Sequence, residues 1–345
     1  MRKTTTRRRK TRKTTTSKRA RLPAPAPLLF LGLSPAECPL SRARVAFIPA
    51  PFDQTTSYMP GTRFGPRAIL EASRQVEFYD EELDLEPFRI GIATLAEIEV
   101  VPGNPAAELD RLEAVCAGLA NAGILPFTLG GEHSLTIAPV RALKARYPDL
   151  CVLQLDAHLD LRAEYQGTRL SHASVMRRVR ELGVPTVAVG IRSVSREEAD
   201  MVHAEAAPVF LAREIREKGL PVDAILSRLG TPVYVTIDLD AFDPAYVPGV
   251  GTPEPGGLTW EEGLKLLRAV CERRQVVGCD IVELCPIPGQ PVSDFFAAKL
   301  ANKMIGYLGL SQAEAARKRP PPAGAPRASR RSRGSSRASH RSSHR

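Results

Sequence analysis

The stretch Val233-Tyr-Val-Thr-Ile-Asp-Leu-Asp240 begins as a run of β-branched and apolar residues and turns acidic at its end. Five further short apolar runs lie along the chain and have the same character. They are Val45–Pro49, Gly123–Leu129, Leu150–Leu155, Thr186–Ile191 and Gln275–Leu284. Because such nearly continuous apolar runs are typical of strands covered on both faces, we interpret them as strands of a parallel sheet.

Between these strands the apolar residues recur at helical spacing. The segments with this pattern are Pro105–Ala122, Ile137–Arg146, Ala173–Leu182 and Glu261–Arg273. Alternation of strands and helices predicts an α/β fold, a three-layer α/β/α sandwich whose central sheet is mostly parallel. Ligands of such sheets bind beyond the carboxyl ends of the strands, so we expect a functional site there.

Three of the predicted strands run into polar clusters. The clusters are Gly130-Gly-Glu-His-Ser134, Asp156-Ala-His-Leu-Asp160 and Asp238-Leu-Asp240, and Asp243 follows the last of them. In an extended backbone every second side chain points to the same face. The spacing therefore predicts that Asp156, His158 and Asp160 converge, and that Asp238 and Asp240 do the same.

The clusters bring four carboxylates close together, and carboxylates without counter-ions repel each other and are costly to bury. Two divalent cations would neutralise them, with His133 and His158 as imidazole ligands. Mixed carboxylate and imidazole ligands favour manganese or a similar borderline metal. Any one of these residues alone is more often a cap or a hydrogen-bonded surface group, but three clusters at strand ends together favour a metal centre.

Further segments are predicted to surround this centre. Gly251-Thr-Pro-Glu-Pro-Gly-Gly257 is a glycine-rich loop, and Glu283 lies near the end of the last predicted strand. His172 follows a predicted loop, 164–170. An imidazole titrates close to neutral pH, so His172 could transfer protons there. We expect His203, in a helical stretch rich in Glu and Ala, to be structural.

The composition is that of an ordinary globular protein. The chain has 345 residues, of which 43% are hydrophobic and 25% charged, close to the usual averages. No run approaches the ~20 apolar residues that span a membrane, so no membrane partner is expected. The six cysteines form no Cys-x-x-Cys pair, which favours buried free thiols in a reducing compartment, and we expect a cytoplasmic protein.

The net charge of +10 arises from the two ends of the chain. Residues 1–21 hold 11 Lys and Arg, residues 317–345 hold 10, and neither segment contains an acid. The intervening residues include 27 basic and 38 acidic side chains, a net charge of −11. We predict disordered tails that either bind polyanions weakly or are solvated without a role. A signal peptide is disfavoured because the apolar run Leu28–Leu33 is short and follows three prolines.

Taken together, these segments resemble the ureohydrolase family, which includes arginases and agmatinases. The resemblance rests on the motifs GGEHS, DAHLD, SHAS, DLDAFDP, GTPEPGG and DIVEL and on the segments Pro51–Tyr58 and Gly61–Arg67. It covers about residues 29–310, which we expect to form one catalytic domain between a basic tail, 1–28, and a basic tail rich in Pro, Ser and Arg, 311–345. It also implies an arginase-like fold and a homo-oligomer, either a trimer or a hexamer.

The resemblance implies a role for each candidate residue. His133 and Asp160 would bind one of two manganese ions per subunit, His158 and Asp240 would bind the other, and Asp156 and Asp238 would bridge them. Thr252 and Glu283 would contact the substrate guanidinium, and Glu283 and His172 would be catalytic, with His172 as the proton shuttle. Glu132 and Leu159 depart from the usual motifs of the family, but neither is a ligand position.

Two such metals activate water, which would attack the guanidinium carbon and release urea and an amine. The sequence is most similar to the agmatinase branch, so agmatine, cleaved to putrescine and urea, is the expected substrate. Arg162 leaves an alternative open. If it points into the site, it would repel the ammonium of agmatine and favour a carboxylate, as in guanidinobutyrate; if it pairs with Glu164 or another acid, which we favour, it would lie away from the substrate.

Three other functions remain as alternatives. Within the same family the protein could be a guanidinobutyrase or an arginase. The non-enzyme alternative is a polyanion-binding protein on an inactive hydrolase body. Intact residues at all six expected ligand positions argue against an inactive site.

Overall fold

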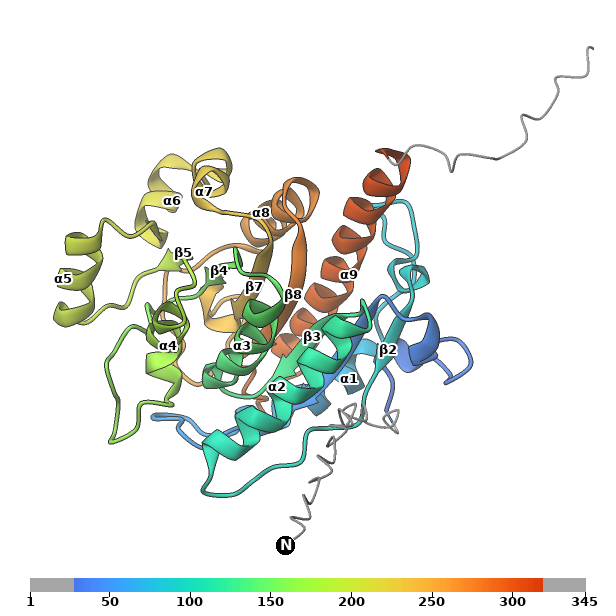
Figure 1. The fold of residues 1–345 in the computed structure, drawn as a ribbon, viewed down its shortest axis with the longest axis horizontal. Helices are drawn as coiled ribbons and strands as arrows, with labels where there is room; N and C mark the ends of the chain where they lie inside the picture. Colours follow the sequence, from blue (N-terminus) through green and yellow to red (C-terminus); the bar gives the residue numbers. More distant parts are fainter. Residues whose placement is uncertain (1–27, 319–345) are drawn as a thin grey trace, which may run out of the picture.

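Residues 28–318 are described by a computed structural model, with side chains to residue 310. Figure 1 shows strands at the centre and helices around them. In chain order the strands are β1 (Val45–Ala50), β2 (Ile92–Thr94), β3 (Leu125–Gly130), β4 (Cys151–Leu155), β5 (Thr186–Ile191), β6 (Val209–Leu211), β7 (Val233–Asp238) and β8 (Val276–Val282). All six strands predicted from the sequence are present, with ends shifted by no more than two residues.

The strands form one sheet in the order β2-β1-β3-β8-β7-β4-β5-β6. Each neighbouring pair in this sheet is parallel, which confirms the predicted α/β class. Ile237 of β7 pairs with Leu155 of β4 and with Ile281 of β8. The residues that follow these partners therefore leave the sheet side by side at its carboxyl edge.

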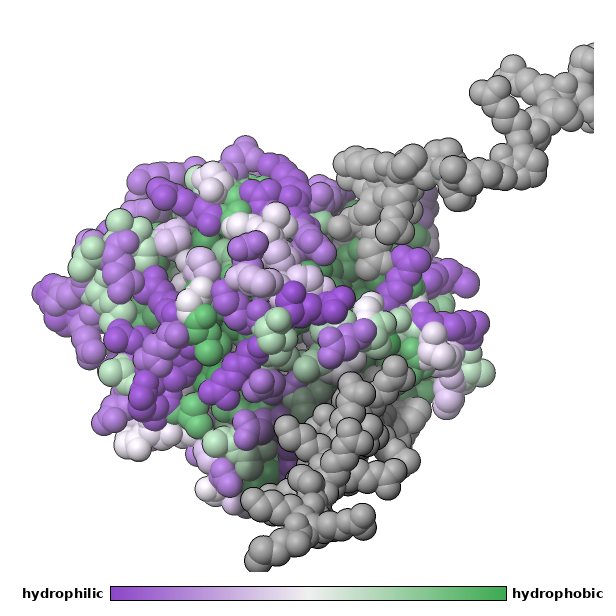
Figure 2. Space-filling model, viewed as in Figure 1, coloured by the Kyte–Doolittle hydropathy of each residue, from purple (hydrophilic) through white to green (hydrophobic). Residues whose placement is uncertain are grey.

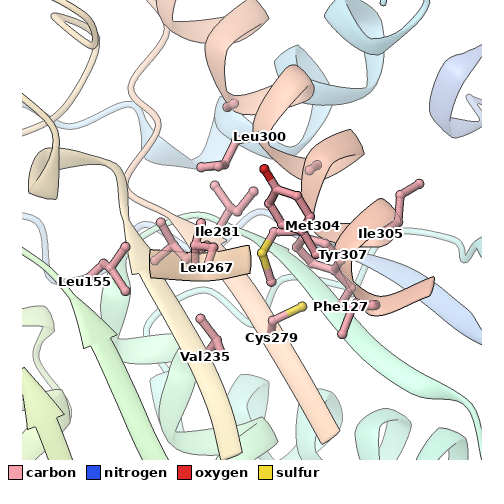
Figure 3. Close-up of a cluster of buried hydrophobic side chains, with 14 of the residues drawn as sticks. Phe127, Leu155, Val235, Leu267, Cys279, Ile281, Leu300, Met304, Ile305 and Tyr307 are labelled. Carbon is pink, nitrogen blue, oxygen red and sulfur yellow. The ribbon is translucent and has the colours of Figure 1, made fainter. Parts of the chain in front are cut away.

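Helices cover both faces of the sheet. They are α1 (Gly65–Ser73), α2 (Pro105–Asn121), α3 (Ile137–Arg146), α4 (Val175–Glu181), α5 (Arg196–Glu205), α6 (Ala212–Lys218), α7 (Val222–Arg228), α8 (Trp260–Arg273) and α9 (Val292–Lys318). One apolar core joins the sheet to α2, α3 and α4, and a second joins it to α1, α6, α7, α8 and α9. Figure 3 shows part of the second core, where Val235 and Ile281 of the sheet lie with Leu267 of α8 and Met304 of α9. The two cores account for the predicted three-layer sandwich.

Local sequence motifs determine where two of the helices begin and how closely two segments of the backbone pack. Ser195 and Glu198 form a capping box at the start of α5, and Thr259 and Glu262 form one at the start of α8; such boxes satisfy backbone N–H groups at the first turn. At Gly131, a Cβ atom would lie 1.7 Å from the backbone of the segment that follows β1. Only glycine allows this close approach.

Several features differ from the sequence prediction. β2 and β6 were not predicted, because edge strands of three residues are too short to give a periodicity signal. The helix predicted over 173–182 begins with a separate 3-10 turn, η6 (His172–Ser174), before α4. Helix α9 continues beyond residue 310, the expected end of the catalytic domain, to Lys318. The remainder of both predicted tails lies outside the described residues.

The burial of the cysteines and the hydrophilic character of the surface agree with what the composition predicted. All six cysteines are buried and unpaired, as their spacing predicted. Figure 2 shows a face of the molecule on which hydrophilic residues are widespread and apolar residues are scattered. Within residues 28–318, none of the helices combines the length and apolar character that crossing a membrane requires.

Candidate metal centre and active site

The candidate metal ligands lie at the carboxyl ends of β3, β4 and β7, which are three of the four central strands of the sheet. His133 begins the 3-10 turn η5 (His133–Thr136) after β3, Asp156 follows β4 directly, and Asp238 is the last residue of β7. Possible ligand atoms of these three residues lie within 4.8 Å of one another. Asp156, His158 and Asp240 form a second such group. The predicted convergence of these residues is therefore present in the structure.

The convergence has a different cause from the one that the sequence suggested. Strand β4 ends at Leu155, so 156–160 is not an extended strand, and Asp160 has a left-handed backbone with φ of 55°. Asp240 lies in a 3-10 turn, η7 (Leu239–Ala241). The side chains are thus aligned by tight turns and not by strand alternation. A left-handed backbone at a residue other than glycine costs about 1–3 kcal/mol and is most frequent at functional sites.

His133 lies at the centre of the first group. Its Nδ1 atom is 3.1 Å from an oxygen of Asp156, 3.1 Å from one of Asp160 and 3.2 Å from one of Asp238. The same nitrogen is buried and has no hydrogen bond of good geometry. A single N–H serves one acceptor, whereas a cation binds a ring nitrogen and several carboxylates together. The donor set therefore fits a metal ion.

His158 occupies the second group. Its Nδ1 atom is 3.0 Å from Oδ2 of Asp240 and 3.6 Å from Oδ1 of Asp156. Because the other oxygen of Asp156 faces His133, Asp156 lies between the two groups. This position is compatible with a ligand shared by two ions.

The electrostatics show that the cluster attracts positive charge. Burial alone would lower the pKa of His133, but its contacts with three carboxylates, led by Asp156, outweigh burial and raise that pKa well above its usual value. The pKa of His158 is raised to about 12, because Asp240 and Asp156 outweigh burial there too. Burial and the nearby carboxylates raise the pKa of Asp238. Divalent cations would supply the missing charge.

The two residues expected to contact the substrate also reach this edge. Glu283 follows β8 with φ of 65°, and its Oε1 accepts the backbone N–H of His133 at 2.6 Å. Burial, together with the neighbouring Glu132 carboxylate, raises the pKa of Glu283 well above its usual value. Thr252 donates its hydroxyl to Asp240 at 3.3 Å. Glu283 and Thr252 line the same cavity as the metal ligands.

His172, the first residue of η6, also lines that cavity. Its Nδ1 lies 3.5 Å from the hydroxyl of Thr55 and its Nε2 lies 3.3 Å from the hydroxyl of Ser57. Tyr165 packs edge-on against the imidazole, with ring centroids 5.7 Å apart. Burial is the main cause that lowers the pKa of His172 to about 4. Burial therefore favours the neutral form of the ring, and the role of His172 in proton transfer stays a prediction.

Three apolar side chains lie at the mouth of the cavity, where it opens to solvent. Its volume is about 280 Å³. Tyr58, Met59 and Val194 line it with exposed fractions of 73%, 45% and 40%. The cavity therefore has a buried, charged end and a solvent-exposed mouth, where these three apolar side chains lie with polar residues such as Ser57.

Arg162 is part of the cavity wall. The residue lines the cavity, and its guanidinium carbon lies 5.1 Å from the centre of the Tyr165 ring, a distance at which a cation is attracted to an aromatic face. Among residues 28–310, Arg162 forms no ion pair with Glu164. The pairing with Glu164 that we favoured from the sequence is therefore absent, and the position of Arg162 relative to a substrate stays a prediction.

The sequence analysis gave no role to three residues that shape the site. Thr55 and Ser57 contact His172; they lie in the N-terminal segment that resembles the family, and its run of hydroxyl residues was the available signal. Arg192 donates to the backbone carbonyls of Asp240 and Glu254, both at 2.6 Å. It thereby ties the glycine-rich loop to η7, and no local pattern marked it.

The sequence of this chain is similar to the sequences of known proteins. Residues 43–306 match the Arginase family. The chain is 44% identical to the N(1)-aminopropylagmatine ureohydrolase of Synechocystis sp., over 78% of this chain and 90% of that protein. It is 39% identical to an agmatinase of Bacillus anthracis, over 69% of this chain and 82% of that protein.

The fold is also similar to that of a solved structure. The agmatine ureohydrolase of Thermoplasma volcanium superposes with a TM-score of 0.73 and 32% identity, over 79% of this chain and 92% of that chain. The structural similarity thus extends over most of both chains. The chain belongs to the arginase family and is an agmatinase-like ureohydrolase.

Proposed function

We propose that this chain hydrolyses the guanidino group of a linear guanidino-amine at a dinuclear manganese centre. The observation that carries the proposal is the pair of buried ligand groups that share Asp156. One ion would be held by His133 and Asp160, the other by His158 and Asp240, and both by Asp156 and Asp238. Four carboxylates and two imidazoles suit manganese. When bound, such ions supply Lewis acidity that lowers the pKa of water.

The side chains of the protein would bind the substrate and move its protons. The buried Glu283 carboxylate would pair with the planar guanidinium through charge-assisted hydrogen bonds. Thr252, oriented by Asp240, would contact the same group. Burial favours the neutral form of His172, whose free ring nitrogen would accept a proton and pass it to the amine as that amine leaves.

We propose a substrate with the agmatine skeleton. Agmatine itself would give putrescine and urea. N(1)-aminopropylagmatine is a second candidate, because the relative with 44% identity bears that name. The apolar mouth formed by Tyr58, Met59 and Val194 would also contact the methylene groups of a longer chain. That substrate would give urea and aminopropyl-substituted putrescine.

Urea release from agmatine, N(1)-aminopropylagmatine, 4-guanidinobutyrate and arginine, each with and without manganese, tests the proposal. We expect manganese-dependent release with the highest kcat/KM on one of the two amine-terminated compounds. A preference for 4-guanidinobutyrate or for arginine would identify a guanidinobutyrase or an arginase. No urea from any compound would overturn the proposal and favour polyanion binding on an inactive body.

Further expectations accompany this proposal. The acidic body favours the approach of a cationic substrate. We propose a trimer or hexamer in the cytoplasm, which light scattering and cell fractionation would check. Any polyanion binding would reside in the basic tails, which lie outside the described residues.

A further inference from the structure

We infer that Glu132 acts through Thr55 to position His172 and to fix which of its ring nitrogens carries the proton. The three residues come from separate parts of the chain and meet beside the cavity. The inference rests on the proposed function, since the protonation of His172 matters only if protons move there during hydrolysis. It assigns a role to Glu132, which is not a candidate metal ligand.

Glu132 anchors the segment that passes over His172. Its side chain is fully buried, and one carboxylate oxygen accepts the backbone N–H groups of Gln54 and Thr55 at 2.7 and 2.6 Å. The other oxygen accepts the hydroxyls of Thr55 and Ser134. Four donors to one buried carboxylate form a well-satisfied, charge-assisted network. Such a network holds Thr55 in one orientation.

Thr55 transmits that orientation to His172. The hydroxyl of Thr55 donates its only proton to Glu132, so its oxygen acts towards other groups as an acceptor. The oxygen accepts the backbone N–H of His172 at 3.1 Å and faces Nδ1 of the ring at 3.5 Å. An acceptor beside Nδ1 favours the tautomer that is protonated there. Ser171, whose hydroxyl lies 3.4 Å from Nδ1, can rotate and does not by itself select a tautomer.

The consequence concerns the other nitrogen of the ring. A neutral imidazole carries a proton on one nitrogen and a lone pair on the other. With Nδ1 protonated, Nε2 keeps its lone pair, and its neighbour is the hydroxyl of Ser57 at 3.3 Å. Nε2 is then the atom that accepts a proton. Without the Glu132–Thr55 contact, the ring would populate the tautomer whose Nε2 cannot accept one.

A double-mutant cycle tests this positioning role. kcat, KM and metal content are measured with the best substrate of the panel for the manganese-loaded wild type, Thr55→Val, His172→Asn and the double variant. We expect Thr55→Val to lower kcat about tenfold, the effect of one hydrogen bond, with KM and metal content unchanged. In the His172→Asn background the same substitution should change kcat less than about twofold, because contacting residues are coupled.

Three further variants add controls and a second test to the double-mutant cycle. Thr55→Ser keeps the hydroxyl and should restore most of kcat. Thr168→Val removes a hydroxyl that accepts the N–H of Leu170 at 3.1 Å in the loop before His172, and should retain wild-type kcat. Glu132→Gln should lower kcat as Thr55→Val does, again only while His172 is present.

The outcomes separate this inference from the proposed function. An active wild type in which Thr55→Val lowers kcat equally with and without His172 would overturn the inference and leave the proposed function intact. Loss of metal in Thr55→Val or Glu132→Gln would also overturn it, because the residues would then act through the metal ligands. A wild type that releases no urea from any compound would overturn both.

Discussion

The carboxyl edge of the sheet and the mouth of the cavity are built in different ways. At the edge, His133 and Asp156 are exposed by 1% and 0% and follow strands at the centre of the sheet. At the mouth, Tyr58 and Met59 are exposed by 73% and 45% and lie in a segment without regular structure. The chemistry thus depends on the core, whereas contact with the far end of a substrate depends on loops, which vary with little cost to the fold.

The difference between the carboxyl edge and the mouth leads to a general prediction. Substitutions at the edge should reduce hydrolysis of every substrate, whereas substitutions at the mouth should change the preference among substrates. His172 connects the two regions, because it lies in the 3-10 turn η6, outside the sheet, and is tied through Thr55 to Glu132 beside β3.

The largest effect is expected at Asp156. Asp156→Asn keeps the shape of the side chain but removes the charge that faces both His133 and His158. We expect activity to fall by at least about 10³-fold on all substrates, equivalent to the several kcal/mol that a metal supplies, with loss of one metal equivalent. Urea assays and elemental analysis of the same preparation measure both. The exposed Asp110→Asn is the matched control, and full activity of Asp156→Asn would contradict the metal assignment.

The next effect concerns His172. His172→Asn should lower the rate by about 10²–10⁴-fold, the usual contribution of a positioned acid or base, while both metals and KM are retained. Since burial lowers the pKa of His172 to about 4, the base form is present above that pH and is lost only below it. The kcat/KM profiles of variant and wild type should therefore run parallel around neutral pH.

The exposed His203→Asn, in α5, serves as the control for this variant. A variant whose profile flattens near neutral pH would show that His172 titrates there in the metal-loaded protein. Joint loss of metal content and melting temperature would instead indicate a structural histidine.

A smaller effect, confined to the mouth, is expected at Arg162. Arg162→Ala removes a cation from the cavity wall, so kcat/KM should rise for agmatine and fall for 4-guanidinobutyrate. A change of about tenfold in the ratio corresponds to one partly solvated charge. Arg169→Ala, in the same loop but paired with Glu181, is the control. An equal change for both substrates would place Arg162 with the chemistry of the edge.

The smallest effect is expected when both basic ends are removed. A chain of residues 22–318 retains the edge, the mouth and all of α9, so its turnover and melting temperature should match those of the full chain. Any salt-sensitive binding of nucleic acid should disappear with the tails. A truncated chain that fails to fold or to assemble would show that the ends are structural.

Much of the fold was predictable from local patterns. The predicted bounds of β5 and α3 coincide with those in the structure, because buried strands and amphipathic helices carry a strong apolar signal over five or more residues. β2 and β6 carry only three residues each and gave no such signal. Their place at the sheet edges depends on pairing with β1 and β5, which the sequence of a short segment does not encode.

The sequence was sufficient to predict that carboxylate and imidazole side chains lie together in the candidate site. The prediction used only the residue types and their positions directly after the strands. Parallel strands of one sheet end at one edge, so the residues that follow β3, β4 and β7 are brought to the same region, where tight turns then align their side chains. The turns themselves were not predictable. The left-handed backbones of Asp160 and Glu283 are held by the surrounding structure against local preference.

The order of apolar runs and polar clusters in the sequence determined the layers of this protein, the edge that carries the chemistry and the residues placed there. Only the tertiary structure decided that Arg162 lies over the ring of Tyr165, that burial lowers the pKa of His172, and that Glu132 reaches His172 through Thr55. The physical reason is that these properties arise from contacts and burial between loops that are distant in sequence. Periodicity and spacing describe neighbours along the chain, and they carry no information about such contacts.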